Sequence, residues 1–95
     1  MTREEFTPLL AEIPAWEVID DRKVTHTFGF DDWAQAQAFV VAAGDIAEQA
    51  GHHPDLTLSW GKVRAEIYTH KINGLAEADF VLAAKLDRLY KEQRG

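Results

Sequence analysis

The first apolar positions of the chain have the spacing of a helix. Phe6, Leu9 and Leu10 fall on one face, and the preceding Thr2-Arg3-Glu4-Glu5 has the Thr-x-x-Glu pattern of a capping box. Pro8 lies inside this segment, and a proline removes a helical hydrogen bond and obstructs the preceding turn. The pattern therefore predicts a short or bent helix.

The spacing then changes to alternation, which predicts two β-hairpins. Apolar and polar residues alternate from Trp16 to Phe30, with Asp20-Asp21 as the turn. A second alternating region follows the break at His52-His53-Pro54. It runs from Leu56 to Thr69, with its turn at Gly61-Lys62.

Two longer segments have the i, i+3, i+4, i+7 spacing of amphipathic helices. Residues 32–50 begin with the capping residue Asp32 and end before Gly51, which is typical of a helix C-terminus. Residues 76–93 follow the loop marked by Asn73-Gly74 and form the last predicted helix. Its buried side is expected to carry Leu75, Ala78, Leu82, Leu86 and Leu89.

The predicted order of elements is α-β-β-α-β-β-α. Hairpins that alternate with helices favour an α+β fold, with one four-stranded antiparallel sheet and the helices packed on one face. No linker or internal repeat interrupts the sequence, so residues 1–95 are expected to form one domain. The pattern leaves open whether water or another subunit covers the opposite face of the sheet.

Composition limits the classes of partner. The 95 residues include 16 Asp and Glu against 10 Lys and Arg, a formal net charge of −6. Broad nucleic-acid binding needs many cations, so this charge argues against a nucleic-acid partner. The absence of cysteine excludes disulfides and thiolate chemistry, and it fits a reducing cytoplasm. No segment approaches the ~20 apolar residues of a membrane helix, so we expect no membrane partner and a cytoplasmic location.

Three of the four histidines flank the second predicted hairpin. His52 and His53 precede its first strand, and His70 follows its second. The start of one strand lies beside the end of the next in an antiparallel hairpin, so these imidazoles are expected to converge at one edge of the sheet. Glu48 and Asp79, on the flanking helices, are expected beside them. Imidazoles and carboxylates together suit proton transfer near neutral pH.

Each of these residues also has an ordinary structural interpretation. Glu48 could be a surface charge, and Asp79 a first-turn residue stabilised by the helix dipole. Three histidines with carboxylates could instead bind zinc, although adjacent histidines before Pro54 point in divergent directions on extended backbone. His26 lies in mid-strand, away from the cluster, and is interpreted as structural or exposed.

The candidate residues form one long spaced motif. Glu48-x-x-x-His52-His53-Pro54 is followed after five residues by Trp60, after nine more by His70, and after eight more by Asp79. This motif resembles the signature of the pterin-4a-carbinolamine dehydratase family, also known as the dimerisation cofactor of a homeodomain transcription factor. Nearly the whole chain takes part, because further matches occur at Phe28-x-Phe30-x-Asp32, Ala36, Phe39, Thr69-His70 and Gly74-Leu75.

The resemblance implies a reaction. The family dehydrates 4a-hydroxytetrahydropterin to quinonoid dihydropterin, releasing water, and so recycles the cofactor of aromatic amino-acid hydroxylases. It implies a hydro-lyase with no metal and no organic cofactor, a functional link to such a hydroxylase, and a homodimer or homotetramer. It also implies catalytic roles for His52, His53 and His70, substrate contacts at Gly51, Tyr68, Thr69 and Lys71, and supporting roles for Glu48, Pro54, Trp60 and Asp79.

The chemistry of dehydration accounts for these residue types. Loss of hydroxide from C4a needs an acid that protonates the leaving oxygen and a base that removes a ring-nitrogen proton. Our hypothesis is that His53 or His70 is the acid, while His52 positions the pterin and its proton. Glu48 is expected to orient a histidine of the doublet.

Two positions depart from the usual pattern of the family, and three other interpretations stay open. Lys71 stands where an acidic residue is common, and Ala76 stands where Thr or Ser would cap the last helix. The alternatives are a protein-interaction module of the coactivator kind, a non-catalytic pterin-binding protein of another pathway such as molybdopterin metabolism, and a zinc protein. A cluster of three imidazoles favours catalysis over a pure binding module.

Overall fold

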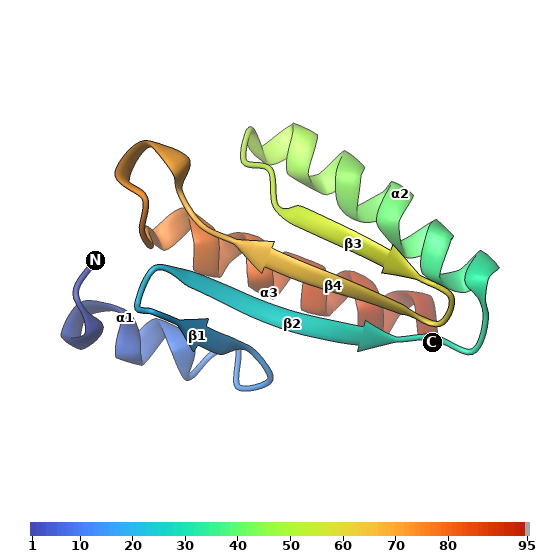
Figure 1. Cartoon of the computed structure of the whole chain (residues 1–95), viewed down its shortest axis with the longest axis horizontal. Helices are drawn as coiled ribbons and strands as arrows, with labels where there is room; N and C mark the ends of the chain where they lie inside the picture. The colour runs from blue at the N-terminus through green and yellow to red at the C-terminus, as the bar shows by residue number, and fades with distance from the viewer. Residues whose placement is uncertain (95) are drawn as a thin grey trace.

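The computed structural model describes residues 1–94 and confirms the predicted order of helices and strands (Figure 1). One short element, the 3-10 helix η1, is additional. None of the helices within residues 1–94 is long and apolar enough to cross a membrane. The elements are α1 (Arg3–Leu10), β1 (Glu17–Ile19), β2 (Lys23–Gly29), α2 (Trp33–Ala50), β3 (Asp55–Ser59), β4 (Lys62–Ile67), η1 (His70–Ile72) and α3 (Glu77–Arg94).

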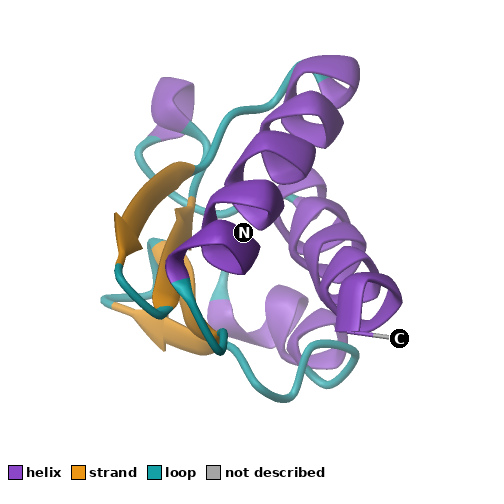
Figure 2. Cartoon of the chain, turned by 90° about the vertical axis from the view of Figure 1, so that its right-hand side faces the viewer, coloured by secondary structure: helices purple, strands orange, loops and turns teal. Residues whose placement is uncertain are grey.

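The four strands form one antiparallel sheet in the order β1-β2-β4-β3. The second strands of the two hairpins, β2 and β4, therefore pair with each other at the centre of the sheet. Seen along the sheet in Figure 2, the strands lie on one side of the molecule and the long helices on the other. This is the predicted α+β arrangement with the helices on one face.

The register shows why the sheet has one buried and one polar face. Successive side chains of a strand point to opposite faces. On the helix-covered face the paired strands present Val24, His26, Phe28, Leu56, Leu58, Val63, Ala65 and Ile67. The opposite face carries Lys23, Thr25, Thr27, Asp55, Thr57, Ser59, Arg64 and Glu66, and so offers hydrogen bonds and ion pairs instead of an apolar surface.

Aromatic side chains connect the helices to the sheet. The ring centroids of Phe28 on β2 and Phe39 on α2 are 4.7 Å apart, and both side chains are buried. Phe6 of α1 stacks on Phe80 of α3 at 6.1 Å. The ring centroid of Phe28 also lies 5.1 Å from that of Tyr90 on α3, so aromatic contacts pack both α2 and α3 against the sheet.

The end of α2 sets the direction in which the histidine doublet leaves the helix. Gly51 has a left-handed conformation with φ of 66°, which glycine adopts without a Cβ clash. The next backbone N–H, that of His52, donates to the carbonyl of Ala47 at 3.1 Å. The turn predicted from the glycine is confirmed, and it fixes the backbone of His52.

Two details of the last third of the chain differ from the sequence pattern. Ala78 is exposed and Asp79 is fully buried, so the buried stripe of α3 begins one position later than predicted. β4 ends at Ile67 instead of Thr69, because the chain turns and Thr69 pairs with Gly74 in an isolated bridge. Both differences bring the start of α3 close to the end of β4.

Candidate active site

A buried carboxylate lies at the centre of the candidate site. Asp79 has no exposed surface, and its two oxygens accept hydrogen bonds from three different segments of the chain. Oδ1 is 2.5 Å from Nε2 of His52. Oδ2 accepts from the hydroxyl of Thr69 at 2.9 Å and from the backbone N–H of Ala76 at 2.7 Å. This set of contacts compensates the cost of burying the carboxylate.

The bonding pattern assigns the proton on His52. An ionised carboxylate only accepts hydrogen bonds, and both partners of Oδ2 are donors. When Asp79 is ionised, Oδ1 therefore accepts from Nε2–H of His52. In the neutral imidazole Nδ1 is then the nitrogen with a free lone pair. Asp79 thus holds the ring in one tautomer as well as in one position.

Asp79 also caps the helix that carries it. Its carboxylate bonds the N–H of Ala76, three residues earlier, and its own N–H bonds the carbonyl of Ala76 at 3.0 Å. This is half of a capping box, since Ala76 has no side-chain oxygen to complete it. The start of α3 and the orientation of His52 therefore depend on the same carboxylate.

The second histidine of the doublet lies on an open rim. Nε2 of His53 is 3.5 Å from a carboxylate oxygen of Glu48, and their side chains are 61% and 81% exposed. By contrast the side chain of His52 is only 17% exposed. The two neighbours thus point to different carboxylates, one buried and one in solvent. The predicted proximity of Glu48 to the doublet is confirmed.

The third histidine lies on the turn that follows β4. His70 begins η1 and is exposed, and its ring centroid is 4.3 Å from that of Tyr68. It directly follows Thr69, whose hydroxyl shares Asp79 with His52. The predicted adjacency of the two ends of the hairpin therefore holds for His52 and the 69–70 segment. Lys71, also exposed, follows on the same turn.

One predicted supporting residue lies apart from this cluster. Trp60 is 68% exposed in the turn between β3 and β4, at the far end of that hairpin from the histidines. This position agrees with the turn predicted at Gly61-Lys62, which places Trp60 at the opposite end of the hairpin from the histidines; its supporting role was implied by the motif alone. Pro54 is half-buried and separates the doublet from β3.

The histidines and carboxylates pair separately and do not form a common ligand set. Within residues 1–94, no group of three or more His, Cys, Asp or Glu side chains is arranged to hold a metal ion. His52 bonds Asp79, and His53 faces Glu48. The arrangement suits donation, acceptance and orientation of protons.

Sequence analysis missed one group of the site, the backbone N–H of Ala76. Because Ala76 has no hydroxyl, the sequence predicted that α3 lacks an N-cap side chain, but it did not predict that the carboxylate of Asp79 caps the helix instead. The signal was present in the spacing, because Asp79 lies three residues after Ala76, where a capping box has its acidic residue.

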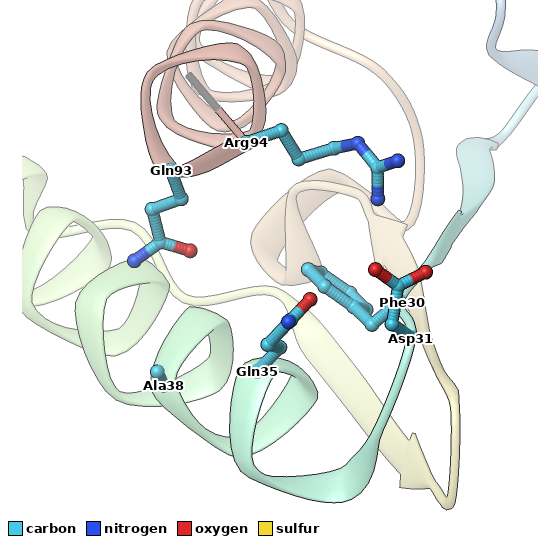
Figure 3. Close-up of a pocket in the computed structure, with 6 residues that line it drawn as sticks. All are labelled: Phe30, Asp31, Gln35, Ala38, Gln93 and Arg94. Atoms are coloured by element: carbon cyan, nitrogen blue, oxygen red, sulfur yellow. The ribbon is translucent and has the colours of Figure 1, made fainter.

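A separate cavity of about 410 Å³ lies elsewhere, between the start of α2 and the end of α3 (Figure 3). It does not include any of the three clustered histidines. Its lining residues are Phe30, Asp31, Gln35, Ala38, Gln93 and Arg94.

Comparisons with known proteins agree with the motif. A family model described as pterin 4 alpha carbinolamine dehydratase matches residues 1–89. Proteins of Rubrobacter xylanophilus and Methylococcus capsulatus, provisionally named pterin-4-alpha-carbinolamine dehydratases, are 44% and 45% identical. The matches cover 90% and 97% of this chain and 80% and 82% of those proteins. A crystal structure of a transcriptional coactivator/pterin dehydratase from Brucella melitensis aligns with a TM-score of 0.88 and 30% identity, covering 95% of this chain and 97% of that one.

Proposed function

This chain belongs to the pterin-4a-carbinolamine dehydratase family, and from that premise we propose that it converts a 4a-hydroxytetrahydropterin into quinonoid dihydropterin and water. In this reaction the bond between C4a and the hydroxyl oxygen breaks. A double bond forms between C4a and the adjacent ring nitrogen, which loses its proton. The protein must deliver one proton to the leaving oxygen and accept one from the ring, so the reaction needs no net oxidant or reductant.

The bond between His52 and Asp79 is the observation that carries this proposal. A buried carboxylate that fixes the tautomer of a partly exposed imidazole is a common way to prepare a proton-transfer group. With Nε2–H bonded to Asp79, Nδ1 of His52 is free to accept the ring-nitrogen proton or to orient the pterin. Thr69 and Ala76 keep the carboxylate in place.

The more exposed histidines suit the acid role. His53 and His70 both reach solvent, so either ring can exchange protons with water. Glu48 lies 3.5 Å from Nε2 of His53, and if this ring carries the proton for the leaving oxygen, Nδ1–H would be the donor that remains free. We assign proton delivery to the 4a-hydroxyl to one of these two histidines. The ring of Tyr68, tilted by 52° against that of His70, would offer an aromatic surface beside the pterin.

The test is the absorbance decay of freshly generated 4a-hydroxytetrahydropterin, with and without protein. Wild type is compared with His52→Ala, His53→Ala and His70→Ala. General acid or base catalysis typically contributes ~10²–10⁴-fold, so removal of a participating histidine should lower the catalysed rate by that order. His26→Gln is the matched control, because His26 packs against Trp16 and Phe28 away from the cluster.

The outcomes separate catalysis from simple binding. A rate increase by wild type and His26→Gln, reduced in the cluster variants, supports the dehydratase. A wild-type protein that binds pterin and leaves the decay at its spontaneous rate would replace the proposal with a pterin-binding role. Equal rates for wild type and all three cluster variants would remove the histidines from the mechanism.

A second candidate function is protein interaction of the coactivator kind. The Brucella melitensis relative carries the double description of coactivator and dehydratase. In this chain α2 exposes Trp33 and Val41, which are 44% and 62% accessible. Exposed apolar side chains on one helix are typical of a contact surface. A pulldown from cell extract that survives His52→Ala would show a binding role independent of catalysis.

The cellular setting follows from the reaction. Its substrate forms when an aromatic amino-acid hydroxylase consumes tetrahydropterin, so we propose that this protein works beside such an enzyme in cofactor recycling. The cysteine-free composition is compatible with the reducing cytoplasm, which we propose as its location. We also propose that it forms a homodimer or homotetramer through exposed apolar residues.

A further inference from the structure

The cavity between α2 and α3 has an aromatic floor and polar walls. Figure 3 shows the ring of Phe30 at its base, with Gln35 of α2 and Gln93 of α3 directed toward the same space. Phe30 is half-buried, and its ring is braced by Phe39 and Tyr90, each with a centroid 5.3 Å away. A fixed aromatic face of this kind favours a flat ligand that stacks on it.

A guanidinium is held in place at the edge of this cavity. Nη1 of Arg94 donates to the carbonyl of Gly29 at 3.2 Å, and the guanidinium lies 5.2 Å from the ring centroid of Tyr90. The hydroxyl of Tyr90 donates to the same carbonyl at 2.6 Å, which fixes the ring. Guanidinium presents five N–H donors, so most of those of Arg94 remain available to a ligand.

A carboxylate lies at the same cavity. Figure 3 shows Asp31 beside Phe30, below the guanidinium of Arg94. The ion pairs formed by the side chains of residues 1–94 do not include one between Asp31 and Arg94. The cavity therefore offers a hydrogen-bond acceptor, the carboxylate of Asp31, and a donor, the guanidinium of Arg94, around the ring of Phe30. The side-chain amides in its lining can both donate and accept.

We propose that this cavity binds a planar heterocycle with a 2-amino-4-oxopyrimidine ring, the ring shared by guanine and pterins. Asp31 would accept from the ring N–H and the 2-amino group of such a ligand. Arg94 would donate to the oxo group and the neighbouring ring nitrogen, the geometry in which arginine reads guanine. The ring stacks on Phe30, and the amides of Gln35 and Gln93 complete the polar contacts.

The lining argues for this class over other small ligands. A free phosphate or carboxylate would meet Asp31 as well as Arg94, and it would leave the Phe30 ring uncovered. Adenine presents an acceptor nitrogen where guanine presents N–H, so it would place a lone pair against the carboxylate. A volume of about 410 Å³ is within the usual range of small-molecule sites and admits a bicyclic ring. The site is separate from the histidine cluster and goes beyond the proposed reaction.

The test is a titration with matched ligand pairs. Pterin is compared with lumazine, which has an oxo group in place of the 2-amino group, by ligand fluorescence. GMP is compared with AMP by calorimetry. Loss of a charge-assisted hydrogen bond costs about a factor of ten or more, so lumazine and AMP should bind at least tenfold more weakly than their partners.

Variants locate the binding. Asp31→Asn and Arg94→Lys should each weaken GMP binding about tenfold. The first removes the negative charge that accepts from the ring N–H and the 2-amino group, and the second removes the planar guanidinium that donates two parallel hydrogen bonds. Asp45→Asn, which changes an exposed carboxylate of α2 outside the cavity, is the matched control and should bind as wild type does. His53→Ala should leave GMP affinity unchanged and lower only the dehydration rate.

The GMP results bear on the cavity site alone, whereas pterin can also bind at the histidine site. GMP binding that is lost in Asp31→Asn and retained in His53→Ala supports the cavity site, whether or not the protein dehydrates carbinolamines. No GMP binding, equal affinity for GMP and AMP, or equal affinity of wild type and Asp31→Asn would overturn it. None of these results alters the dehydration assay, so failure of the cavity site and failure of the dehydratase are distinguishable.

Discussion

Asp79 shows how much a single residue contributes to both stability and the candidate chemistry. Its position in the motif was predicted from the sequence, but the pattern gave it only a first-turn or supporting role. Helical spacing could not reveal that the carboxylate is buried, because burial depends on the turn of residues 68–76 that folds back over the start of α3. The contact with His52 joins residues 27 positions apart and has no local signal.

Replacing Asp79 by Asn is expected to lower activity more than binding. The amide carries no charge and has only one acceptor oxygen for three donors, so the imidazole of His52 loses its fixed tautomer. We expect a fall in kcat of about 10²-fold with a smaller change in KM, because misplacement of a reacting group by ~1 Å has effects of this size. The free energy of unfolding should fall by about 1–3 kcal/mol, since buried donors lose their partner.

Glu77→Gln is the matched control for this variant. Glu77 is an exposed carboxylate in the first turn of the same helix, and it makes the same kind of interaction with the helix dipole. Denaturant unfolding and steady-state kinetics of the two variants separate the roles. If the pH profile of kcat changes in Asp79→Asn and not in Glu77→Gln, Asp79 positions His52. Equal kinetics of the two variants would show that Asp79 only caps α3.

At the scale of elements, the strands and helices were predictable because their hydrophobic spacing is regular. The turn of Gly51 and the capping box of Thr2 and Glu5 are confirmed, since each depends on nearby residues only. The end of β4 was not predictable, because the bridge between Thr69 and Gly74 competes with continued strand pairing. The strand therefore ends at Ile67 although the alternation continues to Thr69, and the loop that follows carries part of the candidate site.

The polar face of the sheet gives a prediction of pH dependence. The hydrogen bond from Lys23, at 2.8 Å, lowers the pKa of Glu66 below its ordinary value of 4.5. A carboxylate whose pKa is lowered by folding stabilises the protein above the unfolded pKa and loses this contribution as pH falls through the folded pKa. We expect Glu66→Gln to cost about 0.2–1 kcal/mol at pH 7, and this difference should disappear as pH falls below the folded pKa of Glu66.

Urea unfolding of wild type and Glu66→Gln between pH 7 and pH 3 measures this difference. Glu17→Gln is the control, because Glu17 lies opposite Thr25 on the same face of the sheet but forms no ion pair among the described side chains. A constant difference between wild type and Glu66→Gln across the pH range would show that the pair does not stabilise through its charge.

At the scale of the whole molecule, the hydrophobic pattern was sufficient for the α+β fold, and the spaced motif was sufficient for the family. Neither could show the cavity at Phe30, because it depends on which ends of the helices meet. The two sites proposed for this chain lie at separate places in the fold. One concerns proton transfer and the other recognition of a flat ring.

The exposed apolar residues of α2 predict self-association. Because Trp33 and Val41 are exposed to solvent, we expect the chain to form a dimer or tetramer. Size exclusion with light scattering should then give a mass of two or four times the 10.7 kDa of one chain. Val41→Glu should shift the mass toward the monomer, because it places a charge in the contact. Val81→Glu on α3, where Val81 is 46% exposed, is the control. A wild-type mass of one chain would contradict the prediction.

The central claim is that His52, held by Asp79, dehydrates a pterin carbinolamine together with His53 or His70. Its most direct measurement is the rate of loss of 4a-hydroxytetrahydropterin with wild type and with His52→Ala, both shown to be folded by circular dichroism. We predict that wild type accelerates the loss well above the spontaneous rate and that the variant loses about 10²-fold or more of this acceleration. A folded wild type without acceleration, or a His52→Ala variant as active as wild type, would contradict the claim.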